Sequence, residues 1–315
     1  MPIKISELEI TNFRGIEHLN LSFRDPKGTP TSLVVLAGPN GCGKTTVLEA
    51  ILLATGFGDL ARGKIGPAAV RSSADDYVIR AEFHDGTSVS CRKATTRSET
   101  GSVAYFSSSR EPKIVGSLGI TVGKKGKRPA KNEVNRLWRL KQHLIDAFAL
   151  DLFLEKARIR QALKVSAYAS ALERLHRVWR RFYPEELFAV EPVDQVPDGG
   201  FDLFVINSNS TRISVDDLSS GQLEVLQLCA EFLLSPTPID VLVIDEPELH
   251  LDPAWHTQII RLIQDLTPET QLIVGTHSPE IYDSAMSFER HFLVSDDDPR
   301  AAYWARSNEL CEAAS

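Results

Sequence analysis

Residues 33–53 read LVVLAGPNGCGKTTVLEAILL, an apolar run followed by a glycine-rich turn and a helix-forming segment. The spacing of Gly38, Gly43, Lys44 and Thr45 matches the pattern G-x-x-x-x-G-K-[ST]. Glycines without a Cβ let the backbone bring its N–H groups against phosphate oxygens, and the start of the following helix favours the same anion. A chance glycine-rich turn is the alternative, but the strand before and the helix after the turn favour a phosphate-binding loop.

The residue types in this loop indicate how it would hold a nucleotide. Lys44 is expected to contact the β- and γ-phosphates, and the Thr45 hydroxyl is the expected Mg²⁺ ligand. Cys42 is interpreted as a small filler inside the loop. Gly56 is expected to end the helix.

The composition predicts a water-soluble globular chain of one large or two medium domains. The 315 residues are 43% hydrophobic and 24% charged, which suffices for a real core. The N-terminal MPIKISELEI lacks the apolar region of a signal peptide, and no apolar run reaches membrane-spanning length, so a cytoplasmic location is expected. The four cysteines form no C-x-x-C pair and are expected to be reduced thiols.

The net charge of −7 hides an uneven distribution. Residues 124–181 contain 16 Lys/Arg and 5 Asp/Glu, so this segment carries +11 and the rest of the chain carries −18. The sequence therefore predicts one basic segment on an acidic body.

Alternating apolar residues predict strands in residues 1–36, interrupted at Asn12-Phe13-Arg14-Gly15. Arg14 on this turn is interpreted either as a phosphate clamp or as a solvated turn residue. After a loop at 56–75, the runs 77–83, 87–92 and 102–106 predict an antiparallel sheet, with Asp85-Gly86 as a hairpin turn.

Residues 123–132, GKKGKRPAKN, are predicted to form an exposed loop, and two helical patterns follow. The first apolar stripe comprises Val134, Leu137, Trp138, Lys141, Leu144, Ile145 and Phe148. The second comprises Tyr168, Leu172, Leu175, Trp179 and Phe182, and Pro184 ends it. The opposite faces carry Arg136, Arg139, Arg174, Arg177, Arg180 and Arg181. These arginines are either an ordinary solvated face or a contact surface for a polyanion.

The C-terminal third carries three further polar groups, each next to a predicted strand or helix end. Residues 218–222, LSSGQ, open a predicted helix, whose start forms a second anion site. The buried-strand run 239–244 ends at Asp245-Glu246, where Asp245 would orient a Mg²⁺ shell and Glu246 would polarise an attacking water. Another predicted strand, 271–274, leads to His277, which is expected at the same sheet edge.

Taken together, GPNGCGKT, LSSGQ, VLVIDEPELHLDP and THS resemble, in this order, the Walker A, signature, Walker B with D-loop, and switch-histidine motifs of ABC-type ATPases. The opening LEITNFRGI is similar to the start of the SMC/RecF-like branch, which includes RecF-like and OLD-like ATPases. The resemblance covers roughly residues 1–122 and 183–295. It implies an α/β fold, an ABC ATPase head with a mixed central sheet and an antiparallel β lobe. Residues 1–122 and 183–315 would form this nucleotide-binding domain, and residues 123–182 a basic helical lid insertion.

The resemblance also implies ATP and Mg²⁺ as cofactors and assigns roles to single positions. Lys44, Glu246 and His277 would be catalytic, and Thr45 and Asp245 would hold the metal. The implied nucleotide-binding residues are Arg14, Gly38, Pro39, Asn40, Gly41, Cys42, Gly43, Lys44, Thr45, Thr46, Ser219, Ser220, Gly221, Gln222 and Asp252. In this superfamily two ATP molecules are sandwiched head to tail, so residues 219–221 would bind the nucleotide of the other subunit of a homodimer, and Asp252 would report across that interface.

The sequence departs from the family pattern in three ways. The glutamine of the Q-loop is expected between the first helix and the strand near residues 77–83, but GPAAVRSSADDY contains none. Either Arg71 or Ser72 takes its place, or the Mg²⁺ coordination differs. The basic segment is also too short for a long coiled coil, and no nuclease signature follows Ser295.

Three functions remain open at this point. The chain would be a RecF-like ATPase that engages nucleic acid through the basic lid in DNA repair or antiphage defence. Alternatively, it would be a regulatory ATPase subunit that controls a separately encoded effector, such as a nuclease. The third function, an ABC transporter subunit, fits poorly with the long stretch between Thr45 and Ser219 and with the NFRG turn. None of the three places the chain in a membrane.

Overall fold

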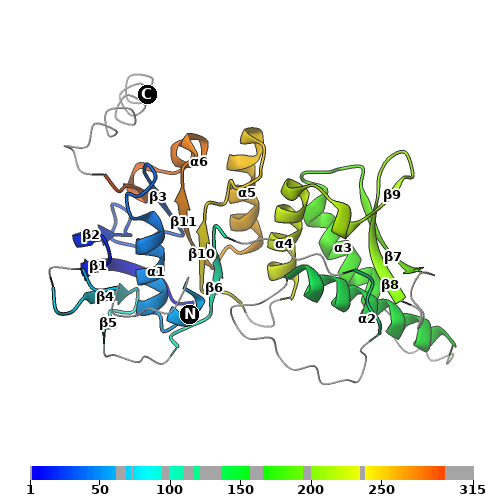
Figure 1. The fold of residues 1–315 in the computed structure, drawn as a ribbon, viewed down its shortest axis with the longest axis horizontal. Coiled ribbons are helices and arrows are strands. Elements are labelled where there is room, and N and C mark those ends of the chain that lie inside the picture. Colours follow the sequence, from blue (N-terminus) through cyan, green and yellow to red (C-terminus); the bar gives the residue numbers. More distant parts are fainter. Residues whose placement is uncertain are drawn as a thin grey trace. The chain divides into compact units, whose positions relative to one another are not determined.

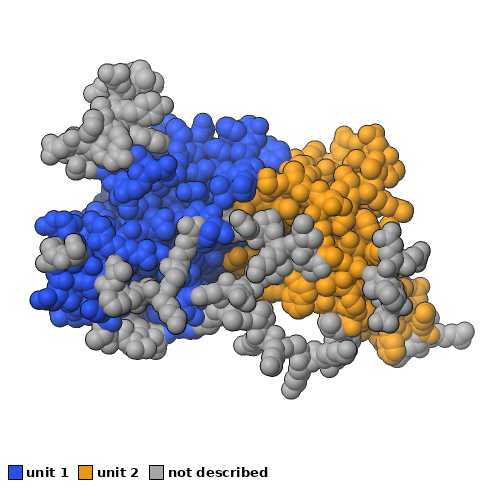
Figure 2. All heavy atoms as spheres, in the orientation of Figure 1, with its two compact units in different colours: residues 1–110, 237–315 blue, residues 111–236 orange. Residues whose placement is uncertain are grey.

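The structure, a computed structural model, describes residues 2–61, 69–71, 74–93, 99–109, 116–120, 136–156, 166–193, 200–234 and 238–294. The chain divides into two compact units, which Figure 2 shows in two colours. Unit 1 comprises residues 1–110 and 237–315, and unit 2 comprises residues 111–236. No helix among the described residues combines the length and apolar character needed to span a bilayer.

The centre of unit 1 is a parallel five-stranded sheet, β12-β3-β11-β10-β6 (Figure 1). Its strands are β3 (Leu33–Ala37), β6 (Val103–Phe106), β10 (Val241–Asp245), β11 (Gln271–Thr276) and β12 (Arg290–Phe292). The strands β3, β10 and β11 are buried along their whole length, as their uninterrupted apolar sequences predict. Because all pairings in this sheet are parallel, the carboxyl ends of β3, β6, β10 and β11 meet at one edge.

A separate antiparallel sheet, β2-β1-β4-β5, forms the predicted β lobe. Its strands are β1 (Ile5–Phe13), β2 (Ile16–Ser22), β4 (Val78–Phe83) and β5 (Ser88–Arg92). The predicted hairpin at Asp85-Gly86 is confirmed, with Gly86 at a φ of 80° and the Asp85 carboxylate accepting the Thr87 N–H at 2.9 Å. The predicted third member of this sheet, 102–106, is wrong, because those residues form β6 beside β10 in the parallel sheet.

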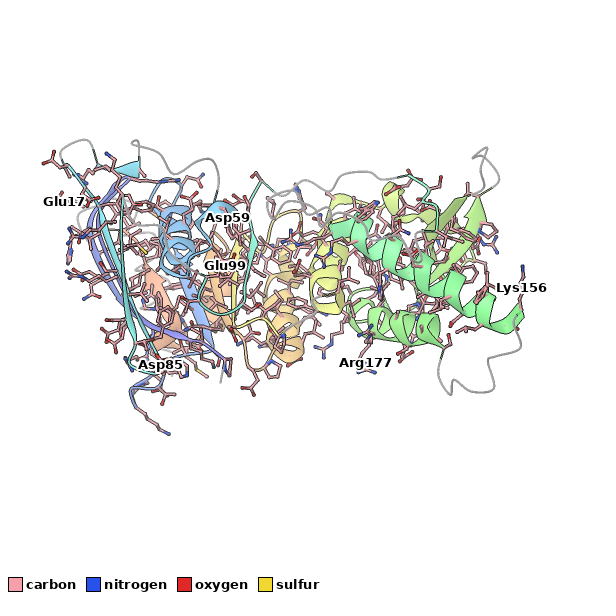
Figure 3. The ribbon with its side chains drawn as sticks, turned by 90° about the horizontal axis from the view of Figure 1, so that it is seen from below. Glu17, Asp59, Asp85, Glu99, Lys156 and Arg177 are labelled. Atoms are coloured by element: carbon pink, nitrogen blue, oxygen red, sulfur yellow. The ribbon has the colours of Figure 1, made fainter. Side chains whose placement is uncertain are left out.

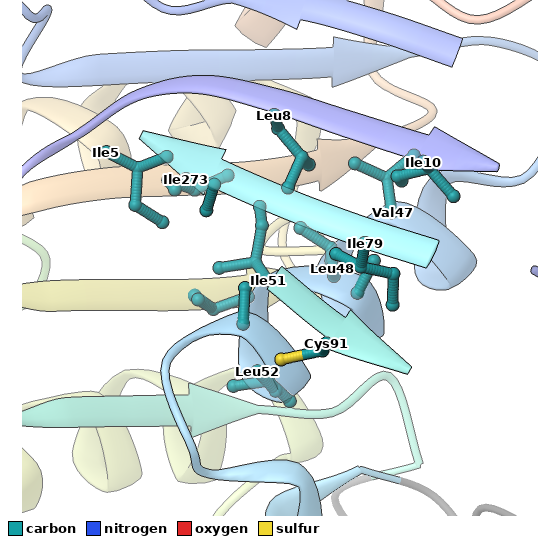
Figure 4. Packing of buried hydrophobic residues seen from close by; sticks show 14 of the residues in the cluster. Ile5, Leu8, Ile10, Val47, Leu48, Ile51, Leu52, Ile79, Cys91 and Ile273 are labelled. Atoms are coloured by element: carbon teal, nitrogen blue, oxygen red, sulfur yellow. The ribbon is translucent and has the colours of Figure 1, made fainter. Parts of the chain in front are cut away.

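The helix α1 (Lys44–Ala54) packs against strands of both sheets, which explains why it is apolar around most of its circumference. Figure 4 shows the contact, with Leu8 and Ile79 of the antiparallel sheet and Ile273 of β11 around Leu48 and Ile51 of α1. The predicted stop at Gly56 is confirmed: this residue follows the C-cap Thr55 with a φ of 85°.

A single buried side chain joins the starts of β1 and β11. The Gln271 amide oxygen accepts the Ile5 N–H at 2.7 Å, and its nitrogen donates to the carbonyls of Ile5 at 2.8 Å and Thr31 at 3.1 Å. Two further helices, α5 (Pro253–Leu266) and α6 (Pro279–Ser284), and the short 3-10 turns Gly58–Leu60 and Ser287–Glu289 complete the description of unit 1.

Unit 2 combines three helices with a small antiparallel sheet, β7-β8-β9. The helices are α2 (Arg136–Lys156), α3 (Ala167–Trp179) and α4 (Ser220–Leu234), and the strands are β7 (Leu187–Val193), β8 (Gly200–Ile206) and β9 (Arg212–Ser214), followed by the 3-10 turn Val215–Asp217. The two predicted helices are confirmed as α2 and α3, with Trp179 fully buried. Val134 lies outside the described residues, and α3 ends at Trp179, before Phe182 and the predicted end at Pro184. Trp138 departs from its predicted stripe, because its side chain is 37% exposed. The predicted loop at 123–132 lies outside the described residues.

Lys141, which the sequence placed on an apolar stripe, is a fully buried ion-pair partner. Its ammonium lies 2.6 Å from an Asp202 carboxylate oxygen on β8 and 2.9 Å from Asp216 in the short turn before α4. A buried ammonium is tolerated only with such compensation, so Lys141 ties α2 to β8 and to the segment that leads into α4.

Candidate nucleotide site

The P-loop, residues 38–45, links the end of β3 to the start of α1. Gly38, Gly41 and Gly43 have φ angles of 147°, 82° and 104°, which residues with a side chain rarely adopt. At Gly38 a Cβ would also lie 2.7 Å from the Cys42 Sγ. Asn40 and Gly41 are exposed at the tip, and Thr46 lies half-buried in the first turn of α1.

Lys44 is almost fully buried, and its ammonium is held inside the loop. It donates to the carbonyls of Gly38 at 2.8 Å and Pro39 at 3.2 Å. Burial lowers the pKa of Lys44, and the nearby Cys42, Asp245, Glu246 and Glu248 oppose that shift.

The Lys44 ammonium also lies 3.3 Å from the His277 Nδ1. Because an ammonium can only donate, Nδ1 must accept, and the proton of a neutral imidazole then sits on Nε2. That Nε2 lies 3.7 Å from a Glu246 carboxylate oxygen. The structure therefore brings together Lys44, His277 and Glu246, from three segments far apart in the sequence.

Asp245 ends β10 and Glu246 follows it, at the same sheet edge. Asp245 is fully buried, and its Oδ2 accepts hydrogen bonds from the Thr45 and Ser108 hydroxyls, each at 2.9 Å. Glu246 has a φ of 55°, a conformation that costs about 1 kcal/mol or more for a non-glycine residue. Its backbone N–H donates to the Gly275 carbonyl at 2.7 Å, which fixes this strained turn against the end of β11.

Glu248 is a site residue that the sequence analysis missed. One of its carboxylate oxygens accepts the His277 N–H at 2.6 Å. The other oxygen is buried, and no described residue forms a hydrogen bond with it. The signal in the sequence was a third carboxylate, two residues after Glu246, in the motif DEPE.

A second contact joins the turn after β10 to the segment after β11. The two ring nitrogens of His256 on α5 lie 2.9 Å from the Ser278 Oγ and 3.3 Å from the Leu251 carbonyl oxygen. Asp252 is exposed and caps α5, because its carboxylate accepts the Ala254 N–H at 2.9 Å. This places Asp252 at a helix start with no contact to the P-loop among the described interactions.

Arg14 does not contact the P-loop in the described interactions. It has a φ of 50° on the turn between β1 and β2, and its guanidinium forms an ion pair with the fully buried Glu49 of α1. Arg71, one suggested substitute for the missing glutamine, is engaged nearby, donating to the Gly15 carbonyl at 3.2 Å and pairing with Glu17 at 3.0 Å. Ser72, the other suggestion, lies outside the described residues.

The predicted second anion site belongs to unit 2, at the start of α4. The Ser219 N–H and hydroxyl both lie 3.1 Å from the Gln222 amide oxygen, and the Gln222 N–H donates to the Ser219 hydroxyl at 3.3 Å. Ser219 and Ser220 are exposed, and Gly221 is half-buried. These reciprocal bonds form a helix cap that leaves the serines on the surface.

The chain has the fold of an SMC head, with a parallel central sheet and an antiparallel β lobe, and it carries a P-loop. A head domain of SMC, solved bound to the C-winged helix domain of ScpA, shares this fold with a TM-score of 0.52 at 14% identity, over 90% of this chain and 92% of that one. Residues 33–283 match the family model described as "AAA domain, putative AbiEii toxin, Type IV TA system", and the chain belongs to this family.

Two curated relatives are similar in sequence. The Septu protein PtuA of Bacillus mycoides is 23% identical over 317 residues, which cover 95% of this chain and 41% of the relative. The Retron Ec83 probable ATPase of Escherichia coli is 35% identical over 88 residues, which cover 24% of this chain and 16% of the relative. The chain thus spans less than half the length of either relative.

Proposed function

We propose that this chain binds ATP with Mg²⁺ at the P-loop and hydrolyses it. The observation that carries the proposal is the convergence of Lys44, Asp245, Glu246 and His277 at one edge of the parallel sheet. Charged side chains also cluster in purely structural ion networks. Here, however, the four side chains lie around a glycine loop whose positive φ angles suit the binding of an anion by backbone N–H groups.

The contacts suggest what each side chain does when ATP binds. Lys44 exchanges its bonds to the Gly38 and Pro39 carbonyls for the β- and γ-phosphates. Glu246 accepts a proton from the attacking water, and the Nε2 of His277 lies 3.7 Å from that same carboxylate. Bound Mg²⁺ would neutralise phosphate charge, and Thr45 with Asp245 supplies the hard oxygen donors that suit it.

We further propose that the working form is a homodimer in which the start of α4 of one subunit meets the nucleotide of the other. The support is that Ser219 and Ser220 are exposed at a helix N-terminus, where a phosphate can replace water at the free N–H groups. The family resemblance supplies the head-to-tail arrangement, and Asp252 would lie at that interface.

We also propose that residues 123–182 form a lid and that this lid binds a nucleic acid. Four arginines of α3 and the turn after it, the basic face, are all exposed: Arg174, Arg177, Arg180 and Arg181. Figure 3 shows Arg177 at the outer edge of α3, pointing away from the helix. The similarity to a Septu protein and to a retron ATPase supports antiphage defence as the setting, ahead of DNA repair. The same similarity supports a separately encoded effector as a further partner.

Two variants test the ATPase proposal. Lys44→Ala is expected to weaken ATP binding at least 100-fold in isothermal titration calorimetry, because the phosphates lose their buried cation. Glu246→Gln is expected to bind ATP normally and to lower the turnover rate at least 100-fold. Unchanged ATP affinity in Lys44→Ala, or unchanged turnover in Glu246→Gln, would overturn the proposal.

A further inference from the structure

Ser108 lies at the nucleotide site through a strand that the sequence analysis placed in the other sheet. It follows β6, which pairs in parallel with β10, so both strands end at the same edge. Phe106, the last residue of β6, is opposite Ile244, which precedes Asp245. Two residues beyond Phe106, the Ser108 hydroxyl donates to the Asp245 Oδ2 at 2.9 Å.

Three segments meet at this one carboxylate oxygen. The Thr45 hydroxyl, from the first turn of α1, donates to the same Oδ2 at 2.9 Å. The two hydroxyls and the fully buried carboxylate form a set of hard oxygen donors. Mg²⁺ takes such oxygens and commonly keeps only one or two protein ligands beside phosphates and water. The residues therefore fit a Mg²⁺ ion that arrives with a nucleotide.

We propose that Ser108 is a protein ligand of the nucleotide-bound Mg²⁺, beside Thr45, in the role that a glutamine has in related ATPases. This inference rests on the proposed function. A serine side chain is short, so it can reach the metal only from a backbone that is already close. The pairing of β6 with β10 provides that proximity, because it starts the loop next to Asp245.

The neighbouring serines show why the assignment falls on Ser108. The Ser107 and Ser109 hydroxyls lie 3.0 Å apart, and the Ser109 N–H donates to the Ser107 hydroxyl at 3.2 Å. These bonds direct the two hydroxyls toward each other. Ser109 is thus a matched control: it has the same side chain in the same loop, but its described bonds go to Ser107.

The test measures the affinity for ATP with Mg²⁺ and with EDTA, using calorimetry on the purified chain. In the presence of Mg²⁺, Ser108→Ala is expected to bind ATP about tenfold more weakly than the unaltered chain. In EDTA the two proteins are expected to bind ATP equally. Ser108→Thr keeps a hydroxyl and should keep the affinity that Mg²⁺ adds, as should Ser109→Ala. A full Mg²⁺-dependent gain in Ser108→Ala would overturn the inference. Absence of ATP binding by the unaltered chain would overturn the proposed function itself.

A change of metal provides a second measurement that does not depend on losing the side chain. Ser108→Cys replaces a hard oxygen with a soft sulfur that prefers Cd²⁺. We expect Cd²⁺ to support ATP binding better in this variant than in Ser109→Cys, and Mg²⁺ to support it worse. Equal responses of the two variants to Cd²⁺ would count against a ligand at position 108.

Discussion

Glu248 shows how a single carboxylate can position another site residue, His277, through its backbone. It accepts the backbone N–H of His277 at 2.6 Å, so it sets the path of the chain between β11 and α6. The imidazole that extends from this backbone is the one within 3.3 Å of the Lys44 ammonium. A hydrogen bond to a charged acceptor contributes about 1.5–3 kcal/mol, enough to select one position of the His277 backbone.

Substitution of Glu248 should therefore separate turnover from binding. Glu248→Ala is expected to lower kcat about 10- to 100-fold with an ATP affinity within about threefold of the unaltered chain, because His277 loses its anchor. Glu248→Gln retains an oxygen that can accept the same N–H and should keep most of the rate. The measurement is steady-state ATP hydrolysis together with calorimetry. A Glu248→Gln variant as slow as Glu246→Gln would identify Glu248 as a proton acceptor instead.

The sequence predicted those site residues that belong to a recognisable local motif. Lys44 and Thr45 follow a glycine pattern, and Asp245 and Glu246 end an apolar strand, so local sequence suffices. Ser108 has no such local pattern, and the only local signal for Glu248 is its place in DEPE. Their proposed roles depend on two tertiary contacts, the pairing of β6 with β10 and the bond between Glu248 and the His277 N–H.

Among the elements, the prediction of strands succeeded where burial on both faces produces long apolar runs, as in β3, β10 and β11. It failed for β6, because an apolar run of only four residues, VAYF, suits either sheet, and the pairing with β10 decides between the two sheets. It omitted β7, whose sequence LFAVEPV contains Pro192, a residue that disfavours strands.

The edge strand β12 carries a histidine that should make stability depend on pH. Burial lowers the pKa of His291 to about 4, and its ring packs against Phe23 with centroids 5.4 Å apart. The folded chain thus favours the neutral ring, so its contribution is complete above the unfolded pKa of about 6.5 and is lost as the pH falls toward 4.

His291→Phe should remove this dependence while keeping an aromatic ring on Phe23. Between pH 7.5 and pH 5, the free energy of unfolding of the unaltered chain is expected to fall by about 2 kcal/mol more than that of the variant. Urea denaturation at the two pH values measures the difference. Equal losses in both proteins would show that the fold does not exclude the charged ring.

On the scale of the whole molecule, the proposed dimer should depend on unhydrolysed ATP. Glu246→Gln keeps the cradle but slows hydrolysis, so with ATP and Mg²⁺ it should accumulate a species of twice the monomer mass in size-exclusion chromatography with light scattering. The added change Ser219→Arg should return it to a monomer, because the exposed helix start can no longer approach a phosphate. A Glu246→Gln chain that stays monomeric while saturated with ATP would contradict the dimer.

The basic face should account for the salt dependence of any nucleic-acid binding. Changing Arg174, Arg177, Arg180 and Arg181 to Gln is expected to reduce the magnitude of the slope of log K against log salt concentration by about 3.6, since each of four phosphate contacts contributes about 0.9. A fluorescence-anisotropy titration with a DNA duplex, in the presence of ATP, measures this slope. The matched control changes the same number of exposed basic residues in unit 1, namely Lys27, Arg92, Lys93 and Arg261. Equal slopes in the two variants would return the basic face to an ordinary solvated surface.

Unit 1 is built from both ends of the chain, and this has a consequence during biosynthesis. The P-loop strand β3 has β11 and β12 as its sheet neighbours, and β6 pairs with β10. Neither β3 nor β6 can therefore form these pairings until residues beyond 240 have been synthesised. A nascent chain on the ribosome therefore exposes its glycine-rich loop long before the carboxylates and the histidine that surround it have been synthesised. Prematurely terminated products that end within unit 2 would carry the loop but lack Asp245, Glu246 and His277, so under the proposed function they would not hydrolyse ATP.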